Sequence, residues 1–157
     1  MGTGLNKLNE EDPTFHVSNN AETHQTVISG TGDIQITLAQ QVKLDGAVIV
    51  STPQDIALID AVKGVNMFKR VEVPILGIVE NMSYYLCPEC GHKEFVFGEH
   101  GARETAERLG EKFLGEIPLN IKIRSYADGG TPIVYAEPDS PFSEAYREIA
   151  AKIAAAL

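Results

Sequence analysis

The sequence lacks any apolar run that approaches the roughly 20 residues needed to span a bilayer. Its opening residues, MGTGLNKLNEEDPTF, lack the apolar core of a secretory signal peptide, and Asn6 stands where a myristoylation signal requires Ser or Thr. The 13 basic residues are outnumbered by 22 acidic ones and form no basic stripe, which argues against binding to nucleic acid or to an anionic membrane. We therefore expect a cytoplasmic protein that has neither nucleic acid nor membrane among its partners.

Two patterns that carry enzyme chemistry are also missing. No Gly-x-x-x-x-Gly-Lys-Ser/Thr occurs in the 157 residues, so the sequence lacks the loop whose amides and lysine hold nucleotide phosphates. No His-Asp-Ser set is supported by spacing either. The length and the 43% content of hydrophobic residues are enough for one domain with a core of its own.

The hydrophobic pattern divides the chain into two parts. Residues 1–26 are polar and aperiodic, which predicts an irregular or disordered segment, and residues 27–157 have the pattern of a folded domain. Apolar runs at 46–51, 73–79 and 113–117 are typical of buried strands, the last stopped by a proline.

Helical patterns lie between and after these predicted strands. One follows Thr52, which can cap a helix whose first position is Pro53, another spans 102–109, and a third begins at Ser140-Pro141. A short strand is expected just after the cysteines, at 94–97. Strands that alternate with helices predict an α/β fold with a parallel sheet flanked by helices.

The only two cysteines, Cys87 and Cys90, lie in the sequence CPECGH. In a Cys-x-x-Cys-Gly knuckle both sulfurs point to one centre, and Gly91 allows the unusual backbone angles that the turn needs. Such thiolate sites bind zinc or an iron–sulfur cluster. In a reducing compartment this spacing favours a metal or cluster site over a disulfide, with a thioredoxin-like redox pair and inert cysteines as the alternatives.

A tetrahedral thiolate site needs four ligands, and this motif supplies two. His92 is adjacent and His100 lies eight residues further along, but a single histidine is more often structural or exposed than a ligand. Two such knuckles related by a two-fold axis would give four thiolates, enough for one cluster or one zinc ion. The motif therefore predicts a site shared between two chains.

Two weaker motifs are compatible with nucleotide binding. Gly30, Thr31, Gly32 and Asp33 precede a helical pattern and can aim N–H groups at an anion, although an ordinary glycine turn is the alternative. Asn81, in the sequence ENMS at the end of a predicted strand, carries a carboxamide that can pair with the edge of a base. The alternative is a loop asparagine that caps a turn.

These motifs occur within longer stretches that resemble one known family. GTGDIQITLAQ, LDGAVIVSTPQDIALIDAVKGVNMFKRVEVPILGIVENMSYYLCPECGHKEFVFG and FLGEIPLNIKIRSYADGGTPIV resemble the Mrp/ApbC family, with the combination of ENMS and CPxCGH as the most specific feature. The resemblance runs from about Gly30 to the C-terminus. Members of this family are deviant-Walker ATPases that act as iron–sulfur cluster carriers, akin to MinD and nitrogenase iron protein. The resemblance thus implies a partial P-loop NTPase-like fold.

The resemblance also implies a site and partners. It implies a homodimer, or a heterodimer with a paralogue, in which Cys87 and Cys90 of each chain bridge a 4Fe–4S cluster that is passed to apo-proteins with the help of ATP and Mg²⁺. The glycine turn at 30–33 matches the end of the switch II segment, so that Asp33 becomes a candidate catalytic residue. Asn81 matches the asparagine near the adenine, and Pro118 lies in the same base pocket.

The resemblance does not extend to the beginning of the sequence. The family carries its glycine-rich Walker loop in an N-terminal half that the residues before Gly30 do not match. We therefore expect the C-terminal portion of a carrier, in which nothing remains to neutralise a triphosphate. The alternatives are a non-catalytic partner module of a full-length paralogue, a zinc-stapled dimer, and an ATPase whose phosphate loop comes from another chain. Loss of central strands would also expose a sheet edge and favour association with another chain.

Overall fold

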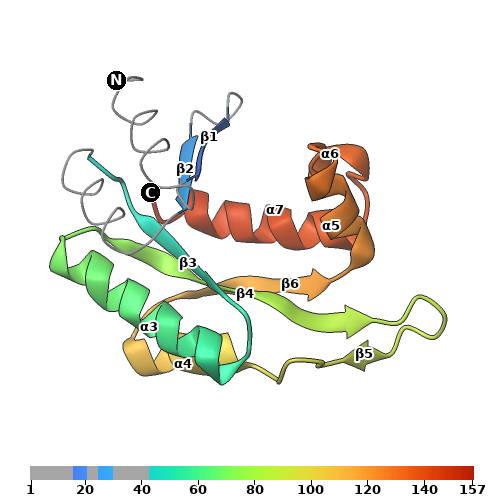
Figure 1. Ribbon diagram of the computed structural model, residues 1–157, viewed down its shortest axis with the longest axis horizontal. Helices are drawn as coiled ribbons and strands as arrows, with labels where there is room; N and C mark the ends of the chain where they lie inside the picture. Colours follow the sequence, from blue (N-terminus) through green and yellow to red (C-terminus); the bar gives the residue numbers. More distant parts are fainter. Residues whose placement is uncertain (1–15, 21–24, 30–42) are drawn as a thin grey trace.

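The computed structural model describes residues 16–20, 25–29 and 43–157. The larger sheet contains β3 (Ala47–Ser51), β4 (Ile75–Leu86) and β6 (Phe113–Leu119), with β4 parallel to both of the others and between them (Figure 1). A short β5 (Lys93–Glu94) pairs antiparallel with the far end of β4. The structure confirms the predicted α/β class with a largely parallel sheet.

Helices cover both faces of this sheet. Figure 1 shows α3 (Asp55–Arg70) and α4 (Gly101–Leu109) on one side, and α7 (Pro141–Ala154) on the other. Two shorter helices, α5 (Ile121–Asp128) and α6 (Ile133–Ala136), lead from β6 to α7. No helix among residues 43–157 is long and apolar enough to cross a membrane.

The alternation of side chains along β4 produces a core on each face of the sheet. Ile78 is fully buried with Ile49 and Val65 on the face that α3 and α4 cover. Its neighbour Val79 points the other way and packs with Leu114 and Ile149 under α7. Successive residues of a strand face opposite sides, so a strand buried on both faces has a continuous apolar run, as β4 does at its start.

Most predicted helix boundaries agree with the structure, and one does not. The Ser140 hydroxyl accepts a hydrogen bond from the Ser143 N–H at the start of α7, as the Ser-Pro sequence predicts. The prediction for the first helix is wrong by two residues. Its N-cap is Gln54, and the Thr52 hydroxyl donates to the Gln54 side chain instead of capping the helix.

Two predicted strand ends are also wrong. β6 continues through Pro118 to Leu119, because β6 is paired only with β4 among the described residues and an edge strand tolerates a missing N–H. The strand expected at 94–97 is only the two-residue β5. Beyond it, the Phe95 ring packs edge-on against Tyr84 and His100.

The N-terminal part differs from the irregular segment expected of residues 1–26. β1 (His16–Asn20) and β2 (Gln25–Ser29) form an antiparallel pair. Backbone hydrogen bonds hold such a pair together whatever the polarity of its side chains, so a polar hairpin leaves little hydrophobic pattern in the sequence. The glycine turn at 30–33 lies outside the described residues.

The outer edge of β3 has no partner strand within the described part of the chain, where β3 pairs only with β4. A groove of about 540 Å³ runs beside it, lined by β3 itself and by small residues of α3 that include Ala57, Ala61 and Gly64. On this strand the Val50 side chain is 58% exposed. An edge with unpaired backbone groups and exposed apolar side chains favours pairing with another chain.

We therefore predict that the protein associates at micromolar concentration and that Val50→Lys reduces this association, because a lysine on an edge strand opposes edge-to-edge pairing. Sedimentation velocity over a concentration series would measure the effect. Val96→Lys is the matched control, since Val96 is similarly exposed but lies outside β3. A wild-type chain that stays monomeric throughout the series, with high cooperative thermal stability, would contradict the prediction.

Candidate metal-cluster site

The two cysteines lie at the tip of a hairpin that extends β4 beyond the sheet. Across the turn, the Cys87 N–H donates to the His92 carbonyl and the Gly91 N–H donates to the Cys87 carbonyl, both at 2.9 Å. Gly91 has φ of +71°, which confirms the predicted need for glycine. Both thiols are free, Cys87 half-buried and Cys90 exposed. The fold therefore presents the motif at the surface.

The turn also favours the thiolate form of Cys87. Backbone N–H groups of Cys90 and then Glu89 donate to it, and with the Cys90 thiol they hold the pKa of Cys87 below its usual value against a smaller effect of burial. The thiolate is the form that binds a metal, and N–H donors stabilise it. A turn, not a helix N-terminus, surrounds this cysteine, which disfavours the thioredoxin-like alternative.

The histidines near the motif have other contacts. His92 Nε2 lies 3.3 Å from Glu94 Oε2, with both side chains largely exposed, and His100 lies at the base of the hairpin. Within residues 43–157 no group of three or more His, Cys, Asp or Glu side chains is arranged to hold a metal ion. In this part of the chain the two cysteine thiols therefore have no third such side chain arranged beside them, and the shared site stays a prediction.

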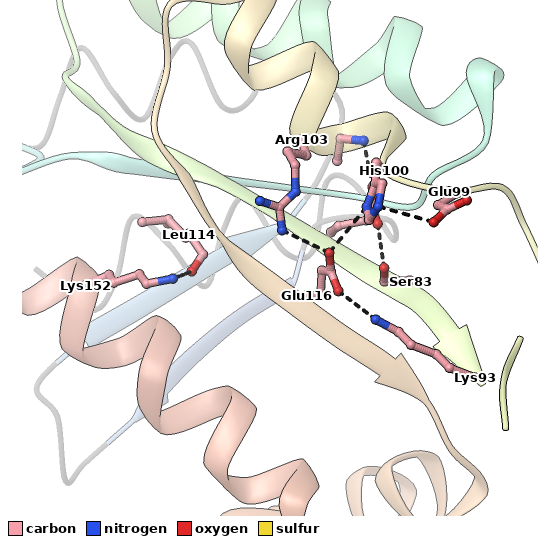
Figure 2. A network of polar contacts seen from close by, with 10 residues as sticks. Ser83, Lys93, Glu99, His100, Arg103, Leu114, Glu116 and Lys152 are labelled. Atoms are coloured by element: carbon pink, nitrogen blue, oxygen red, sulfur yellow. Dashed lines mark hydrogen bonds and ion pairs between the residues drawn. The ribbon is translucent and has the colours of Figure 1, made fainter. Parts of the chain in front are cut away.

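A polar network anchors the returning strand of the hairpin to the sheet (Figure 2). Glu116 on β6 accepts hydrogen bonds from Lys93 of β5 at 3.3 Å and from Arg103 of α4 at 3.1 Å. His100 Nδ1 lies 3.6 Å from the same carboxyl group, and the Lys93 ammonium lies 3.8 Å from the centre of the Tyr84 ring. Sequence reasoning missed this network, because it joins three elements whose proximity no local spacing reveals.

The network makes part of the stability dependent on pH. Burial alone would raise the pKa of Glu116, but Arg103 and Lys93 together outweigh it and lower that pKa. A carboxyl group with a lowered folded-state pKa stabilises the fold above the unfolded value of about 4.3, and this contribution is lost as the pH falls through the folded-state pKa.

We predict that Glu116→Gln reduces the acid sensitivity of folding, with an effect of up to about 1 kcal/mol at pH 7 because ion pairs near the surface contribute little. Urea unfolding of wild type and variant between pH 7 and pH 3 would measure it. The two stabilities should converge as the pH falls. A difference that stays constant over this range would show that the carboxyl charge has no part in the effect.

The residues predicted to contact a nucleotide base lie close to one another. Asn81 of β4 is in register with Ile117 of β6, the residue before Pro118. The Asn81 Oδ1 atom accepts from the Met82 N–H at 3.0 Å, and Met82 has φ of +55°. This local bond is compatible with the turn-capping role that was the alternative for Asn81. Asp33 and the rest of the glycine turn lie outside the described residues.

The fold defines the class of protein. The nucleotide-binding protein from Archaeoglobus fulgidus, solved with ADP and with cobalt, is 38% identical, with a TM-score of 0.61 over 73% of this chain and 46% of that one. The cell division ATPase MinD from Pyrococcus furiosus has a TM-score of 0.56 at 22% identity, over 72% of this chain and 44% of MinD, and shows the fold alone. The described residues thus have the fold of part of a P-loop NTPase domain.

The family follows from closer relatives. The model of the ParA family, described as NUBPL iron-transfer P-loop NTPase, matches residues 28–154. The iron–sulfur cluster transfer protein NUBPL of Dictyostelium discoideum is 55% identical over 79% of this chain, and the iron–sulfur cluster carrier protein of Salmonella typhimurium is 56% identical over 82%. This chain belongs to that family, which confirms the resemblance to Mrp/ApbC-type carriers.

The similarity covers only part of those proteins. The chain spans 38% of the length of the Dictyostelium protein and 35% of the Salmonella protein. A second family model, domain III of elongation factor G, matches residues 1–46. That match covers less than a third of the chain and overlaps the first only at residues 28–46. The N-terminal residues that do not match the carrier family are therefore similar to part of a translation factor.

Proposed function

We propose that this chain binds a 4Fe–4S cluster as cargo and passes it to apo-proteins, with Cys87 and Cys90 of two chains supplying the four thiolates. One observation carries the proposal: two free cysteines lie together at the tip of a hairpin whose N–H groups favour the Cys87 thiolate. The family supports it, since relatives at 55–56% identity are named as cluster transfer and carrier proteins. The second chain is either another copy or a paralogue.

The exposed position of the hairpin suits transfer. Release of a cluster requires incoming cysteines to replace the carrier's thiolates one at a time, with no change in the oxidation state of the cluster. Each incoming thiol gives up a proton as it binds iron, and each released carrier thiolate can take one up. An incoming thiol must reach the iron beside the carrier ligand that it replaces, and Cys90 is exposed whereas Cys87 is half-buried. Cys90 is therefore the first ligand that we expect to exchange.

Nucleotide binding is a second part of the proposal. Asn81 and Pro118 would contact the base, and Gly30, Thr31, Gly32 and Asp33 would face the phosphates with Mg²⁺, all within a domain of residues 27–157. Asp33 is the weak candidate for a catalytic role. The 157 residues contain no phosphate loop, so ATP hydrolysis would need a loop that lies outside them. We place the activity in the cytoplasm, because free paired cysteines suit a reducing compartment.

Anaerobic reconstitution with iron and sulfide tests the proposal directly. We expect the optical and Mössbauer spectra of a 4Fe–4S cluster at one cluster per two chains, followed by transfer to an apo-protein that is separated and assayed. A chain that gains no cluster although its cysteines are reduced and dimers are present would overturn the proposal.

A zinc-stapled structural dimer is the second candidate, since a pair of knuckles with four thiolates suits zinc equally well. Metal analysis of protein purified without oxygen distinguishes the two, because zinc at half the chain concentration, without sulfide, supports the structural role. A pull-down that recovers a full-length paralogue would instead support a non-catalytic partner module.

A further inference from the structure

Glu80 is the first residue of the polar sequence ENMS in β4, and it is completely buried. Its Oε1 atom accepts a hydrogen bond from the Ser83 hydroxyl at 2.5 Å, and its Oε2 atom accepts one from the Ala102 N–H at 2.7 Å. Glu80 and Ser83 both have an exposure of 0%. A buried carboxyl group is costly unless its oxygens are satisfied, so these two bonds are a requirement of the fold.

The two partners of Glu80 stand at the two ends of the cysteine hairpin. Ser83 lies on the outgoing strand, four residues before Cys87. Ala102 lies in the first turn of α4, where the chain re-enters the fold after the hairpin. A single side chain of the central strand therefore connects the departure of the hairpin with its return.

The backbone between Glu80 and the cysteines is irregular. Met82 has φ of +55°, and the register between β4 and β6 shifts between Asn81 and Tyr85. Such an irregularity bends a strand and changes the direction in which it continues. The bond from Ser83 to Glu80 spans this bend and holds the part of β4 that carries the hairpin.

The start of α4 depends on Glu80 for a cap. His100, the N-cap residue, has φ of +60° and no side-chain capping bond. The first N–H groups of a helix have no partner within it, and an acceptor there stabilises the helix start. Glu80 supplies that acceptor from another element. Together with the bonds of Glu116 to Lys93 and Arg103, it attaches the hairpin base to two neighbouring strands.

We propose that Glu80 is a positioning residue that sets the direction of the cysteine hairpin relative to the sheet, which rests on the proposed binding of a shared cluster at Cys87 and Cys90. A site built from two chains needs both hairpins held in place, because four sulfurs must meet within a fraction of an ångström of the required geometry. Glu80 touches neither sulfur and acts through Ser83 and the start of α4.

Glu80→Ala and Glu80→Gln test this role in the full chain. The glutamine amide oxygen can accept from the Ala102 N–H while its NH₂ group donates to the Ser83 oxygen, whereas alanine loses both bonds. We expect Glu80→Ala to release its reconstituted cluster to a chelator roughly 10 to 100 times faster than wild type, the range seen when supporting residues around a metal site are removed. Glu80→Gln should restore most of the wild-type rate.

Hydrogen exchange supplies a readout that needs no cluster. In Glu80→Ala, the Cys87 and Gly91 amides should exchange at least tenfold faster, while the Ile78 and Val79 amides keep the protection that global stability gives them. Glu104→Ala is the matched control, because Glu104 is an exposed acid in the first turn of the same helix. If Glu80→Ala does not fold, Ser83→Ala tests the outgoing strand alone.

The outcomes separate this proposal from the proposed function. A folded Glu80→Ala or Ser83→Ala chain with wild-type exchange in the hairpin and wild-type cluster release overturns the positioning role. A wild-type chain that never gains a cluster overturns the proposed function. In that case the hydrogen exchange of the hairpin amides is the only test of the role of Glu80. An effect of Glu104→Ala equal to that of Glu80→Ala would also overturn it, since any acid at this helix start would then suffice.

Discussion

Cys87→Ala and Cys90→Ala are each expected to abolish cluster binding. Either change halves the thiolates available to a pair of chains, from four to two, and an iron–sulfur cluster needs all four. After anaerobic reconstitution we expect the optical spectrum to show no cluster absorption. A water molecule binds iron much more weakly than a thiolate and does not replace the missing ligand. Folding should be little affected, since Cys90 is exposed and Cys87 half-buried at the hairpin tip.

His92→Ala is the matched control for these variants. It removes a potential ligand from the same turn, but its ring nitrogen lies near Glu94 and its backbone bond to Cys87 does not need the side chain. We expect its cluster content to equal that of wild type. A His92→Ala chain without cluster, beside a Cys90→Ala chain that retains it, would assign the site to Cys87 and His92 instead.

Gly77→Ala is expected to destabilise the fold by more than about 2 kcal/mol, the scale of overpacking in a rigid core combined with backbone strain. Gly77 has φ of +152°, and a Cβ atom there would lie 2.7 Å from the Lys112 carbonyl oxygen and 2.6 Å from Leu114 Cγ. The carbonyl cannot move freely, because it accepts a bond from the Ile78 N–H at 2.8 Å. Chemical denaturation would measure the loss.

Gly64→Ala is the same substitution at a site with space. Gly64 lies within α3, and the nearest atom to its added Cβ would be Ile49 Cδ1 at 3.8 Å. We expect this variant to gain up to about 1 kcal/mol, since alanine is the better helix former. Equal effects of the two substitutions would show that the approach of β6 to Gly77 is not the cause of the loss.

The sequence predicted the β strands best where apolar residues run without interruption. The runs at 46–51 and 73–79 became β3 and the first part of β4, and Gly77 in the second run lies where β6 approaches. The continuation of β4 to Leu86 was not predicted, because Glu80, Asn81 and Ser83 interrupt the apolar pattern. The burial of Glu80 depends on a partner that is distant in the sequence, the Ala102 N–H.

The sequence by itself determined the cysteine turn and the family. CPECGH folds through bonds between residues at most five positions apart, and Gly91 supplies the one backbone conformation that other residues disfavour. Because the geometry of this turn depends on residues close together in the sequence, it can be predicted without a structure.

Only the tertiary structure decided how that turn is held. Glu80 reaches the start of α4 across 22 positions, and Glu116 reaches Lys93 across 23. Most glutamates are exposed surface residues, and the residues next to Glu80 and Glu116 in the sequence do not indicate that the first is buried and the second half-buried. Packing of β4, β6 and α4 brings these carboxyl groups to donors from the hairpin and from the start of α4, and no local sequence pattern specifies that packing.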